Sequence, residues 1–338
     1  MNHKRLPLMP CLALAWLCAI PLACFVGPVY ISLSDMTHIY LHKAGFTQLN
    51  METKEIIINL RLARACLALL CGGALAIAGV ILQACLRNSL ADPFTLGISA
   101  GAAFGASLAL VFPFQLNFTG LQAGNFTALC AMAGSFMALG ASLLIGRAAS
   151  TGGRESIILA GIAVASFLGA IVALIKSLNE ESVTSIVFWL LGSLQGRSWT
   201  SLAPVLICLI PGLAIILPNW RKLDAFLLGD EQAWSLGINP VRMRLLFLLG
   251  ASCITAGCVA ACGIIAFAGL VVPHLVRLAI GSLHGPLLFC SFFGGGIFLL
   301  GADCLARTVL PSGPELPVGV VTALLGAPFF GFLVWRHK

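Results

Sequence analysis

The chain has 338 residues, of which 59% are hydrophobic and only 9% are charged, and its formal net charge is +7. A water-soluble domain usually has about 25% charged residues because its surface faces water, so this composition excludes a soluble protein and indicates a surface that faces lipid. The basic residues stand in short clusters between apolar segments, which indicates orientation in a membrane and no nucleic acid partner.

Ten apolar segments follow one another along the chain, each close to the length of about 20 residues that a membrane-crossing helix needs. We therefore predict an all-α polytopic membrane protein with about ten transmembrane helices in a single domain over residues 1–338. The first segment resembles a signal peptide, but it is longer than a typical one and further spans follow, so we interpret it as a retained helix. The predicted spans are 8–31, 60–84, 94–112, 124–146, 156–176, 200–218, 244–265, 267–281, 286–306 and 316–335.

Lysine and arginine are divided unequally between the two sides of these spans. With a cytoplasmic N-terminus, twelve of the 19 basic side chains fall on the inner side and seven on the outer side. Basic residues are enriched in cytoplasmic loops. We therefore predict that both termini lie in the cytoplasm.

The predicted spans contain few ionisable side chains, although a proton-coupled carrier is expected to hold a buried acid near the membrane midplane. Asp303 lies near an outer helix end, and Arg307 follows at a spacing that allows a salt bridge on one helix face. The chain has no G-x-x-x-x-G-K-[ST] motif, no H-E-x-x-H motif and no cluster of Cys and His. We therefore predict no catalytic residue, no metal and no cofactor bound by this chain, so active transport needs an energy source elsewhere.

The predicted inner loop, at about residues 219–243, contains signals for a short helix. Asp230 and Glu231 follow Gly229 and would complement the positive end of a helix dipole. Gly237 stands where such a helix would end. Taken alone, the segment is equally compatible with a solvated amphipathic turn.

Motifs in a fixed order extend from about residue 60 to the C-terminus. They include RLAR (61–64), RNSLADP (87–93), LGISAGA (96–102), WLLGSL (189–194), FAGLVVPHLVR (267–277), ADCLAR (302–307) and ELPVGVVTALLGAPFF (315–330). This set closely resembles the FecCD/BtuC-type family, the transmembrane subunits of ABC importers for iron siderophores, haem and cobalamin. Ala63 and Ser89 depart from the family pattern, which usually has proline there, but neither change removes a charged contact.

The resemblance implies the type II ABC importer permease fold in the bacterial cytoplasmic membrane. It implies a transporter subunit that is not itself an enzyme, with ATP and Mg bound by two separate ATPase subunits. A second permease, either a second copy or a related chain, would complete the pathway, surrounded by membrane lipid. A periplasmic or lipid-anchored substrate-binding protein would deliver a ferric siderophore, with haem or cobalamin as alternatives. An ion-coupled secondary carrier is the competing hypothesis.

Site residues carried over by matching position fall into three groups. Arg61, Arg64 and Arg307 would bind carboxylates of the substrate-binding protein, and interfacial snorkelling is the alternative role for each. Arg154, Glu155 and Ser156 would lie near a cytoplasmic gate. The coupling loop that contacts the ATPase would contain Phe226, Leu227, Leu228, Gly229, Asp230, Glu231, Ala233, Trp234, Leu236 and Gly237.

Overall fold

The computed structural model describes residues 8–27, 32, 34, 52–112, 123–148, 154–310 and 315–336, and within these ranges it contains helices and connections but no strand. The α-helices are α1 (Leu8–Phe25), α3 (Glu52–Leu86), α4 (Ile98–Val111), α5 (Ala123–Ala148), α6 (Arg154–Leu178), α7 (Val183–Leu190), α8 (Leu202–Ile216), α9 (Trp220–Leu228), α10 (Asp230–Ser235), α11 (Pro240–Cys262), α12 (Ala268–Ile280), α13 (His284–Thr308) and α14 (Val318–Arg336). Short 3-10 helices are η2 (Pro93–Leu96), η3 (Glu180–Ser182), η4 (Trp199–Ser201) and η5 (Leu217–Asn219).

Each of the ten predicted spans overlaps one apolar helix. In the part of the chain that the structure describes, six helical segments are long and apolar enough to cross a membrane: α3, α5, α6, α11, α13 and the segment Trp199–Leu228, which contains α8. Four shorter apolar helices, α1, α4, α12 and α14, account for the other predicted spans. The all-α polytopic fold is therefore confirmed.

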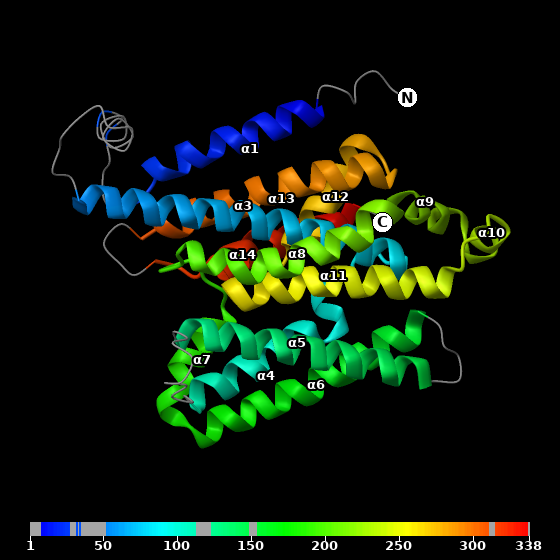
Figure 1. Cartoon of the computed structure of the whole chain (residues 1–338), viewed down its shortest axis with the longest axis horizontal. Coiled ribbons are helices and arrows are strands. Elements are labelled where there is room, and N and C mark those ends of the chain that lie inside the picture. The colour runs from blue at the N-terminus through cyan, green and yellow to red at the C-terminus, as the bar shows by residue number, and fades with distance from the viewer. Residues whose placement is uncertain are drawn as a thin grey trace.

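Helix α3 forms the centre of the larger helix group, in contact with α1, α11, α12 and α13 (Figure 1). Its 35 residues correspond to about 50 Å at 1.5 Å per residue. The helix begins eight residues before the predicted span 60–84, so Arg61 and Arg64 lie in its interior and not at its first turn. A prediction from apolar residues finds only the part of a helix that faces lipid. The first turns of α3 are polar, but they belong to the same helix, so the prediction placed its start too late.

Close helix crossings on α3 depend on glycine. A Cβ atom on Gly72 would collide with the carbonyl oxygen of Gly295 on α13, and a Cβ atom on Gly79 would collide with the carbonyl oxygen of Gly269 on α12. Small residues allow membrane helices to approach until their backbones touch. These two crossings fix α12 and α13 against α3.

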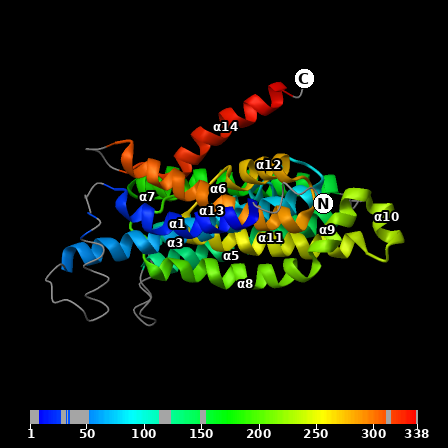
Figure 2. The ribbon, with the colours of Figure 1, turned by 90° about the horizontal axis from the view of Figure 1, so that it is seen from above.

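Helices α4 to α7 form a second group beside α11 (Figure 1). The predicted spans did not include α7, whose eight residues are too few to cross a membrane. The outer face of α6 is apolar and exposed, with Leu159, Ile162, Phe167 and Leu174 between 52% and 67% exposed. Helix α14 leans away from the rest of the bundle (Figure 2).

The two ends of the bundle have different elements. We call them the Asp303 end, where Arg64, Asp303 and Glu315 meet, and the α10 end, where α9 and α10 extend furthest outward (Figures 1 and 2). Helix α1 begins and α14 ends on the side of the bundle toward the α10 end, short of α10 itself.

The predicted loop 219–243 is largely helical, because it contains both α9 and α10. Helix α11 then begins at Pro240, with the Asn239 side chain accepting a hydrogen bond from the Arg242 backbone N–H. Proline suits the first position of a helix because its missing N–H has no intrahelical partner there. The same arrangement begins η2, where Asp92 accepts a hydrogen bond from the Phe94 N–H and Pro93 follows it.

Candidate functional site

At the Asp303 end, one buried carboxylate joins two arginines from different helices. The Arg64 guanidinium on α3 donates to Asp303 on α13 at 2.8 to 3.1 Å. Arg307 lies one turn further along α13 and pairs with the same carboxylate at 3.1 Å, so the predicted salt bridge between these two residues is confirmed. Asp303 is fully buried. A charge in this position is tolerated only when it is paired and hydrogen-bonded.

Further contacts tie this cluster to the rest of the Asp303 end. Arg64 also donates to Glu315, which precedes α14, at 2.7 Å. Arg307 donates to the Val26 carbonyl at 3.0 Å, and Arg61 donates to the Cys24 carbonyl at 2.8 Å. The arginines therefore hold α1, α3, α13 and the start of α14 together.

A hollow of about 220 Å³ opens beside this cluster. Four arginines line it, and Glu315 is the one acidic side chain in its lining, with Asp303 behind it. The four guanidinium charges exceed the two carboxylate charges of these described residues, so the hollow is suited to bind a further carboxylate. The arginines are Arg61, Arg64, Arg197 and Arg307.

The structure thus brings the three predicted docking arginines together, and each is less than 9% exposed. Arg64 and Arg307 turn into the bundle toward Asp303, which differs from the extension along the helix expected for snorkelling. Arg197 and Glu315 were not predicted as site residues. Arg197 belongs to no quoted motif, and its position in the hollow depends on the segment that precedes α8.

At the α10 end, a second charged cluster holds the junction between α9 and α10. Arg87, just after α3, donates twice to the Phe226 carbonyl, at 2.7 and 3.1 Å, and pairs with Asp230 at 3.4 Å. Arg244 on α11 pairs with the other oxygen of Asp230 at 2.8 Å and lies over the Phe226 ring. Side chains from two transmembrane helices therefore fix the junction from two sides.

A third contact joins α9 to α13. One carboxylate oxygen of Asp224 accepts the backbone N–H of His284 at 2.9 Å and lies 2.7 Å from Nδ1 of the same residue. Because the His284 ring is almost fully buried, this contact fixes the base of α9 in the bundle. Movement of α9 is thereby linked to the start of α13.

The predicted coupling loop divides into a buried and an exposed part. Phe226 and Ala233 are buried, and the Phe226 ring packs edge-on against Phe247 of α11. Short helix α10 is present as predicted, and it ends before Gly237, which has a φ of +76°. Four apolar side chains at the tip are 54% to 63% exposed, namely Leu227, Leu228, Trp234 and Leu236.

The predicted gate residues lie at the start of α6. Arg154 is the first residue of the helix, and its side chain lies outside the described residues. Glu155 is exposed and Ser156 is buried. His274 packs its ring against Phe329 and Phe330 of α14.

Sequence reasoning did not assign Arg87 and Arg244 to the coupling region. Arg87 stands in the quoted motif at 87–93, but its partners at Phe226 and Asp230 are about 140 positions away along the chain. Its backbone φ of +48° also places it in a conformation that L-residues rarely adopt. A basic residue at the end of a span signals membrane orientation, and only the folded chain shows which carbonyl it binds.

Comparisons with known proteins show which family the chain resembles. Residues 13–336 match the family model described as the FecCD transport family. The chain is 38% identical to the hemin transport system permease protein HmuU of Yersinia pestis, over 86% of this chain and 86% of that one. It is 37% identical to the cobalamin import system permease protein BtuC of Halobacterium salinarum, over 84% of this chain and 74% of that one.

A solved structure of a metal-chelate type ABC transporter in an inward-facing conformation has the same fold. It aligns with a TM-score of 0.82 at 29% identity and covers 98% of this chain and 99% of that chain. The similarity therefore includes both charged ends as well as the central helices.

Proposed function

The chain belongs to the FecCD transport family and is a permease of an ABC importer, and on that premise we propose that it translocates a ferric siderophore. An importer of this kind works with an ATPase and a substrate-binding protein, and the permease chain is not itself the enzyme. ATP and Mg are proposed to bind on the partner ATPase. The observation that carries this function best is the α9–α10 tip, which presents exposed apolar side chains while its base is held by ion pairs.

The α10 end is the proposed contact with the ATPase. Trp234, Leu228 and Leu236 are each more than half exposed, and large apolar side chains of this kind dominate binding energy at protein interfaces. Arg87 and Arg244 hold the junction of α9 with α10. A displacement of the α9–α10 tip would therefore be transmitted to α3 and α11. This assignment puts both termini in the cytoplasm, because α1 begins and α14 ends on the side of the bundle toward this end.

The Asp303 end is the proposed docking site for the substrate-binding protein. A carboxylate of that protein would enter the hollow and bind Arg61 and Arg197, or replace Glu315 on Arg64. Arginine suits this exchange because its planar group binds carboxylates through two parallel hydrogen bonds. Of the two acids, Glu315 is the one that can leave, because its side chain is 20% exposed whereas that of Asp303 is fully enclosed.

The proposed pathway runs beside α6, where the chain pairs with a second copy or a related permease. The apolar, exposed face of α6 supports this role, since it extends over most of the helix. Arg154, Glu155 and Ser156 at the start of α6 would then lie beside the pathway at the cytoplasmic side. One copy has too few elements around this face to enclose a pathway by itself.

The proposed ligand is supported by the ligands in the names of similar proteins. Those names mention hemin, cobalamin and a metal chelate, all of which are bulky metal complexes. Haem and cobalamin therefore stay as alternatives to a ferric siderophore. The predicted spans contain few ionisable side chains. This suits such a ligand, because a pathway with few fixed charges does not bind it tightly.

Reconstitution tests the proposal. The chain would be placed in liposomes with its ATPase, with ATP and Mg inside and with the substrate-binding protein and labelled ligand outside. We expect uptake of ferric siderophore that vanadate abolishes. Uptake that ignores ATP and vanadate would reject the transport mechanism, whereas ATP-driven uptake of hemin or cobalamin alone would reject only the siderophore.

A second experiment tests the docking hollow. Arg61→Gln removes a cation that lines the hollow, and Lys176→Gln removes a cation in the last turn of α6, outside the hollow. We expect the first variant to bind the substrate-binding protein about tenfold more weakly at low salt, in the range of a partly desolvated charge contact. Equal affinity of the two variants would reject docking through Arg61.

A further inference from the structure

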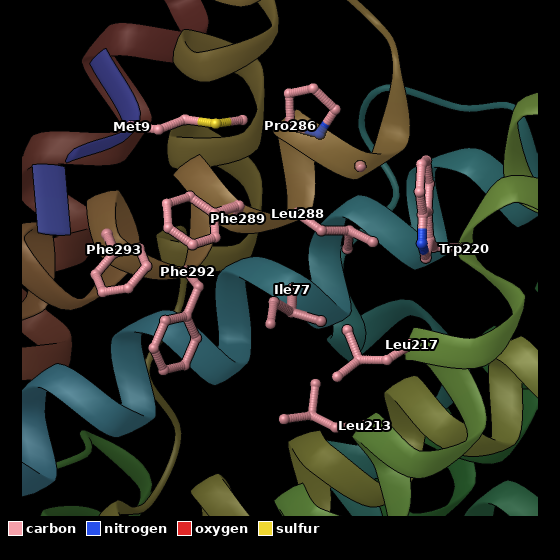
Figure 3. A pocket seen from close by; sticks show the side chains of 11 residues that line it. Met9, Ile77, Leu213, Leu217, Trp220, Pro286, Leu288, Phe289, Phe292 and Phe293 are labelled. Atoms are coloured by element: carbon pink, nitrogen blue, oxygen red, sulfur yellow. The ribbon is translucent and has the colours of Figure 1, made fainter. Parts of the chain in front are cut away.

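An apolar groove lies between α1, α3, α8 and α13 near the α10 end and has a volume of about 510 Å³. This volume falls within the range of about 300 to 1,000 Å³ found for small-molecule sites. Figure 3 shows Phe289, Phe292 and Phe293 at one end of the groove and Trp220 at the other, with Ile77, Leu288, Leu213 and Leu217 between them.

The aromatic wall keeps the groove open. Phe293 packs against Phe289 with ring centroids 4.7 Å apart, meets Phe292 edge-on at 5.4 Å, and meets Trp16 of α1 edge-on at 5.8 Å. These ring contacts hold the three phenylalanines together at one end of the groove. At the other end Trp220 lies so close to Gly285 that a Cβ atom there would meet its ring at 2.7 Å.

The helices on both sides of the groove present apolar side chains outward. Leu14 and Leu17 of α1 are 63% and 58% exposed, and Ile210 of α8 and Leu217 of η5 are 65% and 53% exposed. In a membrane protein such surfaces face hydrocarbon. The groove therefore opens to the lipid phase, where the molecules that can enter it are lipids.

Two cations without an acidic partner among the described residues, Arg221 and Lys222, lie at the Trp220 end of the groove. Arg221 lies over the Trp220 ring, 5.4 Å from its centroid, and Lys222 donates to the neutral side chain of Asn219. Among the described residues, no carboxylate pairs with either cation and no acceptor binds Trp220 Nε1. The nearby acid, Asp224, is directed to His284 instead. Two positive charges and an N–H donor are thus available beside an apolar groove.

From this combination we propose that the groove binds one anionic phospholipid of the leaflet at the α10 end. An acyl chain would fill the space between Trp220 and Phe293, and the phosphate would bind Arg221 and Lys222. Each basic residue near an anionic lipid headgroup contributes about 1 kcal/mol, which is about fivefold in affinity. The two together would favour a phosphatidylglycerol over a phosphatidylcholine by about 25-fold. Because Asp224 ties α9 to α13 beside this site, the lipid would also stabilise the base of the coupling helices.

Lipid binding by the purified full chain in detergent tests this proposal independently of transport. The thermal unfolding shift would be titrated with phosphatidylglycerol, with phosphatidylcholine and with inorganic phosphate, and co-purified lipid would be measured by mass spectrometry. We expect phosphatidylglycerol to act at about 25-fold lower concentration than phosphatidylcholine, and inorganic phosphate to have no effect. A response to inorganic phosphate equal to that of phosphatidylglycerol would overturn the role of the groove.

Two pairs of variants separate the charge from the groove. The double variant Arg221→Gln with Lys222→Gln should lose the preference for phosphatidylglycerol, whereas Arg242→Gln, an exposed arginine at the same end, should keep it. Leu213→Phe fills the groove and should reduce co-purified lipid at least twofold, whereas Ile207→Phe on the exposed face of α8 should not. Equal behaviour within both pairs, or no lipid preference in the wild-type chain, would overturn the proposal.

Discussion

The Asp303 end and the α10 end are both held by aspartates paired with arginines, and they differ in how far water reaches those pairs. Asp303 is fully enclosed and serves Arg64 and Arg307 together. Asp230 also serves two arginines, but its side chain and that of Arg87 are each 36% exposed. Because exposed pairs contribute little stability and buried pairs resist separation, the Asp303 end is suited to stay rigid while the α10 end is suited to move.

The largest expected effect comes from breaking the enclosed cluster. Asp303→Asn would leave the buried Arg307 without a carboxylate among the described residues and Arg64 with Glu315 alone, and breaking a buried ion pair typically costs about 3 to 5 kcal/mol. We expect a large fall in the unfolding temperature of the detergent-purified chain. Glu315→Gln is the matched control, because among the described residues Glu315 pairs with Arg64 alone and is partly exposed, and its expected cost is well under half as large. Equal losses in the two variants would contradict the difference between the ends.

The next effect concerns the exposed tip of the α10 end. Trp234→Ala should leave the unfolding temperature unchanged, because the side chain is 55% exposed. It should weaken binding of the ATPase by about 30-fold, corresponding to the roughly 2 kcal/mol of a typical interface hot spot. Affinity would be measured in detergent, with Trp199→Ala as the control because this tryptophan is 50% exposed in η4, outside the α9–α10 tip. Unchanged affinity would show that the tip does not carry the contact.

A smaller effect is expected at the junction between α9 and α10. Gly229 has a φ of +125°, and a Cβ atom there would collide with Oε1 of Gln232. Gly229→Ala should therefore displace the Gln232 side chain and strain the backbone before α10 by about 1 to 3 kcal/mol, because a φ of 125° with a ψ of 162° suits glycine alone. Gly237→Ala is the control, since its φ of +76° is also positive but a Cβ atom would meet open space. We expect the first variant to lose more ATPase stimulation by substrate than the second.

The last expected effect is a pH dependence at Asp92, a buried carboxylate for which the described residues provide no arginine partner. Burial raises its pKa to about 7 from the ordinary value of 3.8, although the hydrogen bond from Phe94 opposes the change. The folded chain therefore holds this proton more tightly than the unfolded chain. The contribution of Asp92 to the free energy of unfolding is greatest below about pH 4 and falls as the pH rises to about 7.

Asp92→Asn keeps an acceptor oxygen for the cap and removes the titration. We expect the unfolding temperature of the wild-type chain to fall between pH 5 and pH 8 by more than that of the variant. The difference between the two curves is the measurement, since other groups titrate equally in both. Parallel curves would show that Asp92 keeps an ordinary pKa.

The sequence was sufficient to predict features that depend on neighbouring residues. Apolar length located ten apolar helices, six of them long enough to cross a membrane, and the spacing of Asp303 and Arg307 indicated their salt bridge. Helix α9 was missed because Trp220 continues directly from the helical turn of η5, so no glycine or clear boundary separates it from α8. The predicted span 200–218 ended at Pro218. In the structure this proline occupies an early position of η5, and the helical chain continues beyond it.

Most of the site contacts could not be predicted because they join distant parts of the chain. Arg64 and Asp303 are 239 positions apart, and Arg87 and Phe226 are 139 apart. Their pairing follows from the packing of α3 against its neighbours, which depends on the glycine contacts at Gly72 and Gly79. The family resemblance supplied Arg61, Arg64 and Arg307 as a group, but not the internal carboxylate that Arg64 and Arg307 share.

Helix α3 places a strict limit on insertions and deletions in this protein. It carries Arg64 near one end of the bundle and leads without interruption to Arg87 at the other. One added or lost residue between them would rotate one arginine about 100° relative to the other and shift it by about 1.5 Å. Either the contact of Arg64 with Asp303 or that of Arg87 with the Phe226 carbonyl would then be lost. The number of residues between these two arginines is therefore expected to be the least variable length in the chain.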